Sequence, residues 1–236
     1  MQPRTLSLII VFSPLFVSNL VYLLSASQGF IPWCIPYIDG CTTISKAARS
    51  GDSLYIFRAT MIAYGVLLVW FWIYVRQWLK LLYGYTTLMS HFIFWLGVVG
   101  AIFLILYVDF LGTTGEMNRF MRHVGIFIFF IFTPLAQLLL LVQHYKMSNS
   151  LAKSNINRKI LHYQLFVIVL IIFIAIISLA LDITHTKSYE SENIVEWNIA
   201  LLMQFYFLGM VFIWKDYKYY LKIDNQTIEN ALKSKE

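Results

Sequence analysis

Six long stretches of the chain contain no charged side chain. A helix needs about 20 apolar residues to cross the roughly 30 Å hydrocarbon core of a bilayer, and these stretches are near or above that length. They also lack the alternating polar positions of a surface helix or a half-buried strand. Because backbone polar groups in lipid must be satisfied within the segment, each stretch is predicted to be an α-helix. The uncharged stretches are residues 5–38, 59–75, 81–108, 123–145, 160–181 and 197–214.

The sequence therefore predicts an all-α, polytopic membrane protein, a single six-helix transmembrane bundle over residues 1–236 with no soluble domain. Composition agrees with this fold class, because 13% of the residues are charged, whereas soluble domains usually carry about 25%. Residues 215–236 are predicted to form a polar tail. The six helices are predicted near residues 6–24, 54–75, 91–110, 124–143, 160–181 and 197–214.

The distribution of basic residues predicts the orientation of the bundle. If the N-terminus is cytosolic, the cytosolic segments hold 12 of the 18 Lys and Arg residues but four of the 12 acidic ones. The positive-inside rule counts Lys and Arg near helix ends, so both termini are predicted to be cytosolic. The net charge of +6 is thereby explained by topology, and no nucleic-acid partner is expected. The same residues would attract anionic lipid by roughly 1 kcal/mol each.

The first outer loop, residues 25–53, contains the two cysteines of the chain, Cys34 and Cys41. If that side of the membrane is oxidising, the two residues can pair across a short loop. Two free thiols fit the sequence nearly as well, and both interpretations stay open.

Ionisable residues gather where the predicted helices meet the outer side. A charge at the membrane centre costs about 2.5–3.5 kcal/mol on insertion scales, and such groups tend to pair or to line a wet cavity. Convergence of the helix ends would let Arg58 and Arg119 neutralise Asp109 and Glu196. The alternative is that all these side chains are ordinary interfacial residues that extend to water. The predicted outer group is Arg58, Asp109, Arg119, Arg122, His123, Asp182 and Glu196.

Metal and nucleophile motifs are weak on this side. A catalytic zinc needs three protein ligands and an open position, but the outer side offers only His123 and His185 among the histidines, with no HExxH spacing. No GxSxG motif marks a nucleophile either, although Ser45, Cys34 and Cys41 could lie near His123. We therefore expect no metal and no cofactor.

The notable polar residues inside the spans are amides. Asn19, Gln137, Gln143 and Gln204 are predicted to hydrogen-bond between helices, each bond being worth about 0.6–2 kcal/mol. A small-solute transporter is less favoured, because charged residues at helix midpoints and paired broken helices are missing.

Three stretches resemble the damage-regulated autophagy modulator (DRAM) family. "PYIDGCTTISKAARSGDSLYIFR" (36–58) resembles its first-loop motif. "DFLGTTGEMNRFMRHVGIFIFF" (109–130) resembles its outer loop between helices three and four, with a His-x-Gly at the start of helix four. "EWNIALLMQFYFLG" (196–209) resembles the Glu-Trp/Tyr pair that opens the last helix.

The resemblance spans nearly the whole chain and implies a six-helix topology. The family also includes FRAG- and SFK-like proteins, among them a Golgi factor for lipid remodelling of GPI anchors and a plasma-membrane regulator of phospholipid organisation. The resemblance implies functional roles for His123 with Gly125 and for Glu196 with Trp197. Asp39 stands where the family often has Ser, and "SKAARSG" lacks the usual prolines, which indicates a distant member of microbial or other origin.

The resulting hypothesis is a DRAM-like protein that binds or organises membrane lipid through a polar pocket on the non-cytosolic side. Arginine suits phosphate because its guanidinium makes bidentate contacts. The alternative is an enzyme of lipid acyl remodelling, with His123 as general base and a carboxylate such as Glu196 orienting it. The predicted headgroup-binding residues are Arg58, Asp109, Arg119, Arg122, His123, Glu196 and Trp197.

The expected partner is membrane lipid, and a second copy of the chain or another membrane protein stays an open partner. A bacterial inner membrane and a eukaryotic endomembrane or plasma membrane fit the sequence equally well.

Overall fold

The computed structural model describes residues 1–150 and 156–217, and the regular structure in these ranges is helical. Six helices are long and apolar enough to cross a membrane. The predicted fold class, an all-α protein with six membrane spans, is confirmed. The long helices are α1 (Pro3–Ser27), α4 (Gly51–Tyr83), α5 (Leu88–Asp109), α6 (Glu116–Ser150), α7 (Arg158–Ile183) and α8 (Tyr189–Ile213).

Each predicted helix overlaps one observed long helix, and several observed helices extend further. α4 continues past the predicted end through Arg76 and Lys80 to Tyr83. It ends at Gly84, whose φ of 78° is the left-handed conformation typical of a helix C-terminus. A helix can continue beyond the apolar layer of the membrane, where it contains charged residues. The predicted end of this helix at residue 75 is set by the first charged residue and is therefore earlier than the observed end. The predicted tail, residues 215–236, lies outside the described residues from 218 onward.

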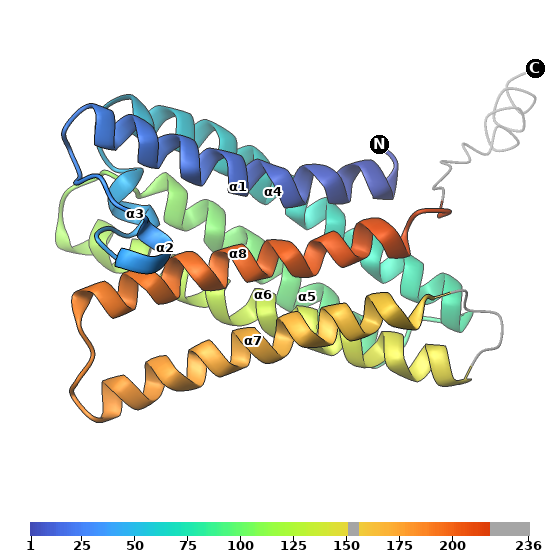
Figure 1. Ribbon diagram of the computed structural model, residues 1–236. Helices are drawn as coiled ribbons and strands as arrows, with labels where there is room; N and C mark the ends of the chain where they lie inside the picture. Colours follow the sequence, from blue (N-terminus) through green and yellow to red (C-terminus); the bar gives the residue numbers. More distant parts are fainter. Residues whose placement is uncertain (151–155, 218–236) are drawn as a thin grey trace, which may run out of the picture.

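The long helices form a ring in which each packs on its neighbours. α1 contacts α4 and α8, and contacts continue from α4 through α5, α6 and α7 back to α8 (Figure 1). Large aromatic rings fill the centre, where Phe71 packs edge-on against Trp72 and Phe207. Gly97 of α5 faces Trp72, and a Cβ atom there would collide with the indole.

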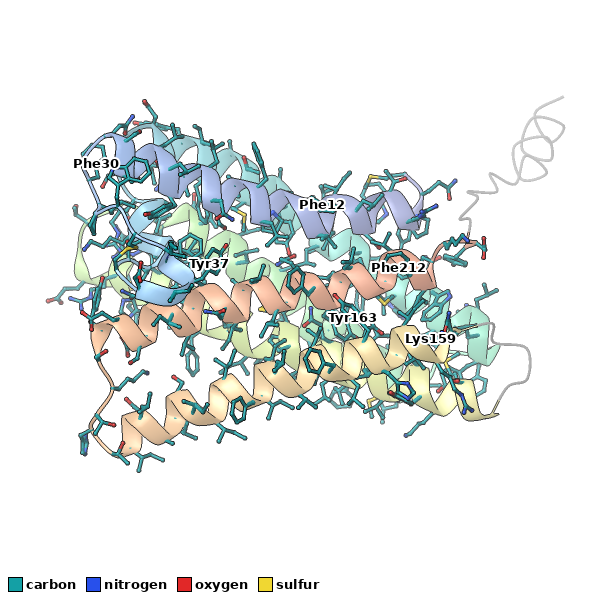
Figure 2. All side chains as sticks on the ribbon, viewed as in Figure 1. Phe12, Phe30, Tyr37, Lys159, Tyr163 and Phe212 are labelled. Atoms are coloured by element: carbon teal, nitrogen blue, oxygen red, sulfur yellow. A yellow bond between two sulfur atoms is a disulfide. The ribbon has the colours of Figure 1, made fainter. Side chains whose placement is uncertain are left out.

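The outer surface of the ring is apolar. Phe12 and Phe212 are both more than half exposed, at 56% and 54%, and point away from the bundle (Figure 2). Extended apolar surface of this kind marks a binding or membrane surface in a protein. In a chain with six candidate spans, it is the surface that contacts lipid tails.

Residues 28–50, here called the cap, connect α1 to α4. The cap contains two short helices, α2 (Pro36–Asp39) and α3 (Ile44–Ala47), and packs against α1 and α8. It lies at one end of the bundle, here called the capped end (Figure 1). The N-terminus and the last residues of α8 lie at the opposite end.

α7 is packed along only half of its length. Its buried residues all fall between Leu161 and Ile171, and no residue from 172 to 183 is buried. Toward the capped end, α7 therefore separates from α6 (Figure 1). This separation creates the space in which the candidate site lies.

Candidate functional site

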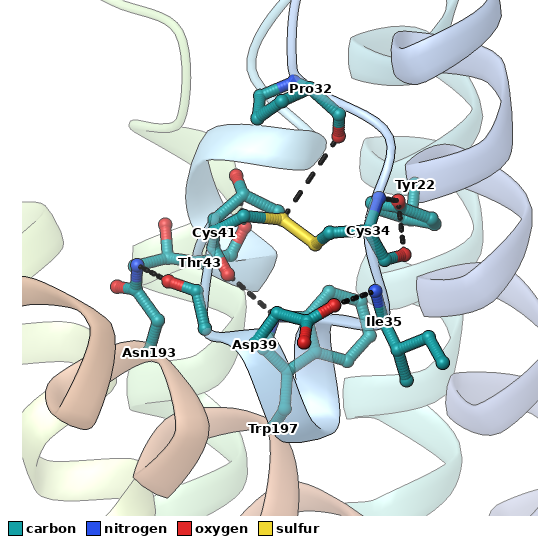
Figure 3. The surroundings of a disulfide bond; sticks show 11 residues. Tyr22, Pro32, Cys34, Ile35, Asp39, Cys41, Thr43, Asn193 and Trp197 are labelled. Carbon is teal, nitrogen blue, oxygen red and sulfur yellow. Dashed lines mark hydrogen bonds between the residues drawn. A yellow bond between two sulfur atoms is a disulfide. The ribbon is translucent and has the colours of Figure 1, made fainter.

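The cap is tied to the first turns of α8 by side chains that donate to its backbone. Trp197 Nε1 donates to the carbonyl of Thr42 over 2.8 Å, and Asn193 Nδ2 donates to that of Gly40 over 2.6 Å (Figure 3). Asn198 Nδ2 donates to the carbonyl of Tyr37 over 2.9 Å. These bonds satisfy carbonyl groups that a short loop cannot pair internally. α8 therefore fixes where the cap lies.

A disulfide closes the cap on itself. Cys34 and Cys41 are joined, with 6.5 Å between their Cα atoms (Figure 3). The Tyr22 hydroxyl accepts from the Cys34 amide over 2.7 Å and donates to the Cys34 carbonyl over 2.6 Å. Asp39 Oδ2 accepts from the amide of Ile35 over 2.7 Å. Of the two states that the sequence left open for the cysteines, the structure contains the pair.

Tyr37 and Gly40 also determine how the cap packs against α1 and α8. Burial raises the pKa of the Tyr37 hydroxyl, an effect that its hydrogen bond with Asn19 partly offsets. The hydroxyl therefore stays protonated at neutral pH. Gly40 adopts a φ of 62°, and a Cβ atom there would collide with the Glu190 carbonyl. Only glycine lets the cap approach α8 this closely.

A cavity of about 1110 Å³ lies between the cap, α6, α7 and α8. Its polar and apolar residues come from different depths of the helices. The charged lining residues belong to the cap, to the turns of α6, α7 and α8 nearest it and to the connection between α7 and α8, whereas the deeper lining residues of α6 and α7 are mostly apolar. The polar lining includes Ser45, Lys46, Arg49, Tyr107, Arg122, His123, Asp182, Lys187, Glu192 and Glu196. The apolar lining includes Phe127, Phe130, Ile131, Ala175, Leu179 and Ile199.

Glu196 and Ser45 are hydrogen-bonded neighbours in the polar part of the cavity. Glu196 Oε1 accepts from the main-chain amide of Ser45 over 3.4 Å. Ser45 Oγ lies 2.6 Å from the hydroxyl oxygen of Tyr107. Arg49 and Arg122 line the same cavity as Glu196. Two guanidinium groups and one carboxyl group therefore border this space.

The other charges of the cavity are partly paired. Lys187 Nζ lies 3.0 Å from Glu192 and 4.0 Å from Asp182 at the turn between α7 and α8. Lys46 lies over the ring of Tyr189, 5.9 Å from its centroid. Arg49 forms no ion pair within 1–150 and 156–217. The part of the cavity near Arg49 and Arg122 is therefore net positive.

Three of the predicted site residues line this cavity, namely Arg122, His123 and Glu196. Arg122 also holds the loop before α6, since its Nη1 donates to the carbonyl of Thr113 over 2.8 Å. His123 is exposed at the rim. No hydrogen bond joins His123 to Glu196 or to Ser45 in the described part of the chain.

The other four predicted residues lie elsewhere. Arg58 Nη2 donates to the main-chain carbonyls of Asp109 and Leu111, so it closes the end of α5 and does not pair with a carboxylate. The Asp109 side chain is exposed, and so is Arg119, one turn before Arg122. Trp197 is 1% exposed and faces the cap. The expected pairing of Arg58 and Arg119 with Asp109 and Glu196 does not occur among the described residues. The guanidinium group of Arg58 instead donates to backbone carbonyls at the end of α5, and Arg119 is exposed.

Sequence analysis missed Arg49, Lys46 and Tyr107 as site residues. Arg49 lies in the long outer loop, and only the fold of the cap brings it beside α6. Tyr107 is the third residue from the end of α5 and resembles an ordinary interfacial tyrosine. No group of three metal-ligating side chains occurs among the described residues.

The His-x-Gly pair has a packing explanation. A Cβ atom at Gly125 would lie 2.8 Å from the Phe103 carbonyl oxygen and 2.9 Å from the Tyr107 amide nitrogen. α6 therefore touches the backbone of α5 at this point. The close approach sets the position of His123 relative to Tyr107.

The family model of the Frag1/DRAM/Sfk1/Cwh43P N-terminal domain matches residues 4–215. This range contains the cap, all six long helices and the cavity. The chain belongs to this family. Neither the comparison with curated proteins nor that with solved structures found a match.

Within this Frag1/DRAM family member, the two residues of the Glu-Trp pair serve different surfaces. Trp197 points to the cap, and Glu196 points to the cavity. Glu196 also contacts the cap, because it accepts from the main-chain amide of Ser45.

Proposed function

We propose that this Frag1/DRAM family membrane protein binds or organises membrane lipid by holding a phospholipid in the cavity between the cap, α6, α7 and α8. The observation that carries the proposal is the division of one cavity into a cationic part near the cap and an apolar part along α6 and α7. A phospholipid has the same division along its length.

The charges support a phosphate in the cationic part. Arg49 and Arg122 line the same cavity, and Arg49 has no ion-pair partner among the described residues. Two adjacent guanidinium groups repel each other unless an anion lies between them. Guanidinium groups also match phosphate oxygens with paired hydrogen bonds.

The size of the cavity supports a headgroup with part of its chain. Its volume of about 1110 Å³ is slightly larger than typical ligand pockets, which measure about 300–1,000 Å³. Phe127 and Ile131 on α6 face the same space as Ala175 and Leu179 on α7. The unburied half of α7 gives a lipid a lateral path into this space from the bilayer.

Lipid retention by the purified protein tests this function. In Arg49→Gln/Arg122→Gln, the affinity for phospholipid measured by native mass spectrometry should fall about tenfold or more. The matched control is Arg119→Gln on the same helix, which removes an exposed charge that does not line the cavity. Since Arg122 also bonds Thr113, Arg49→Gln alone is measured as well and should show part of the loss. Unchanged lipid binding in both Arg49 variants would refute the proposal.

An acyl-remodelling enzyme is the second candidate, because His123, Glu196 and Ser45 line one cavity. A general base must lie within hydrogen-bond reach of the proton it removes. Here the Ser45 hydroxyl is already bonded to Tyr107, which places lipid binding first. His123→Ala separates the two functions: an enzyme would lose turnover by orders of magnitude, whereas a lipid binder would lose at most a few-fold in affinity.

A further inference from the structure

A second cavity, of about 870 Å³, lies at the opposite end of the bundle, between the end of α4, the start of α5 and Tyr217, which follows α8. α4 lines it with a single face, because Ile73, Arg76, Gln77 and Lys80 recur at helical spacing. Arg76 precedes Tyr83, the last residue of α4, by seven positions, or about 10 Å along the helix. The cavity is therefore near the membrane surface, far from the site at the capped end.

Arg76 is held in place by neutral groups. Its Nη2 lies 3.1 Å from His91 Nε2, and its guanidinium carbon lies 5.0 Å from the centroid of the Phe94 ring. His91 Nδ1 lies 3.1 Å from the Thr87 carbonyl oxygen, which can only accept. Nδ1 therefore carries the proton, and Nε2 accepts from Arg76. The guanidinium is oriented without losing its charge.

Among the described residues, the cations of this cavity have no acidic neighbour in its lining. Its lining residues in the described ranges include Arg76 and Lys80 but neither Asp nor Glu. Neither cation forms an ion pair with a described residue. The C-terminus of α4 and the N-terminus of α5 meet here, so their opposite helix dipoles largely offset each other. Two positive charges thus remain open to a ligand.

We infer that this cavity binds the phosphate of an anionic phospholipid headgroup. Arg76 offers paired donors to the phosphate, Lys80 adds a second cation, and Gln77 offers an amide beside them. Ile73 and Leu81 are exposed on the same face of α4 and would contact the start of the acyl chains. Free inorganic phosphate presents the same anionic chemistry, so the test separates the two sources.

The test uses the full chain in detergent and titrates phosphatidylserine and phosphatidylcholine separately by native mass spectrometry. We expect Arg76→Gln/Lys80→Gln to weaken phosphatidylserine binding about tenfold or more. Phosphatidylcholine binding should weaken less, because its quaternary ammonium group offsets the charge of its phosphate. The matched control is Arg4→Gln/Lys146→Gln, which removes two exposed charges that lie outside this cavity. The control should stay within about twofold of the unmodified protein.

Two further arms make the result decisive. Excess inorganic phosphate should leave bound phosphatidylserine in place, and displacement would instead identify the free anion as the ligand. If the double variant unfolds, Lys80→Gln alone decides, because Lys80 is exposed; its loss should be about threefold or more. An equal loss in the control variant, or no preference for phosphatidylserine in the unmodified protein, would overturn the inference.

Discussion

At the scale of single residues, Glu196 and Trp197 are adjacent in sequence but do different work. The Trp197 indole is buried against Tyr22 and Tyr37, with ring centroids 6.2 and 5.0 Å away. Its Nε1 satisfies the carbonyl of Thr42, a residue with no exposed surface. Glu196 faces the cavity one residue earlier. Neighbouring residues on a helix point about 100° apart, which allows one pair to serve two surfaces.

Trp197→Phe should therefore destabilise the cap. The substitution keeps an aromatic ring but leaves the buried Thr42 carbonyl without its donor, at a cost of about 1–3 kcal/mol. Thermal unfolding in detergent measures the effect. Trp33→Phe is the matched control, since Trp33 is 64% exposed and should unfold at the same temperature as the unmodified protein. Equal unfolding temperatures for the two variants would show that the indole bond does not hold the cap.

The sequence could predict the depth of single residues but not their partners. Arg122, His123 and Glu196 were predicted at the outer helix ends, and all three line the cavity. Arg58 was predicted at the same depth, yet it bonds the carbonyls at the end of α5. The depth of a residue in the membrane follows from its position along the helix. The direction in which a side chain points also depends on how each helix is rotated about its axis relative to its neighbours. This rotation cannot be read from a single sequence.

At the scale of elements, the contact between α5 and α6 is set by Gly125. A Cβ atom there would meet main-chain atoms of Phe103 and Tyr107, which cannot move aside without moving α5. The same two helices also meet at Gly100, where the nearest atom is the Thr133 hydroxyl at 2.9 Å and the next lie at 3.6 Å. The two glycines therefore differ in what surrounds them.

Gly125→Ala should destabilise the bundle, because overpacking against backbone costs about 1–3 kcal/mol. Gly100→Ala is the control in the same helix pair. There the better helix propensity of alanine, about 0.5–1 kcal/mol, offsets a contact with one side chain. Unfolding temperatures of both variants in detergent measure the difference. A Gly125→Ala variant as stable as Gly100→Ala would contradict the close approach.

The existence of the long helices followed from the sequence, whereas the cap did not. Uncharged length predicts a membrane helix because lipid leaves the backbone no other partner. The cap depends on three donors from α8 and on a disulfide between Cys34 and Cys41. The three hydrogen bonds from α8 join residues more than 150 positions apart, and hydrophobic periodicity carries no information about them.

At the scale of the whole molecule, both cavities lie near bundle ends and their charges differ. The cavity at the capped end contains carboxylates as well as cations, whereas the opposite cavity has cations without an acidic lining residue in the described ranges. We propose that the capped end faces away from the cytosol, on the basis of the positive-inside rule. The disulfide in the cap supports this orientation, since disulfides persist in oxidising compartments.

Cysteine labelling in intact cells tests the orientation. A membrane-impermeant maleimide should label Thr114→Cys, in the exposed loop between α5 and α6 at the capped end. It should label Lys146→Cys, at the opposite end, only after the membrane is permeabilised. The two native cysteines are paired and do not react. Labelling of Lys146→Cys in intact cells, with Thr114→Cys protected, would reverse the orientation.

The central claim is that a phospholipid occupies the cavity at the capped end, with its headgroup at Arg49 and Arg122 and its chain between α6 and α7. A phospholipid with a photoactivatable group on its acyl chain tests this claim most directly, because peptide mapping locates each crosslink. We predict crosslinks concentrated at Phe127–Ile131 and Ala175–Leu179, and reduced about tenfold in Arg49→Gln/Arg122→Gln. Crosslinks spread evenly over the exposed faces of all six long helices, and unchanged in that variant, would contradict the account.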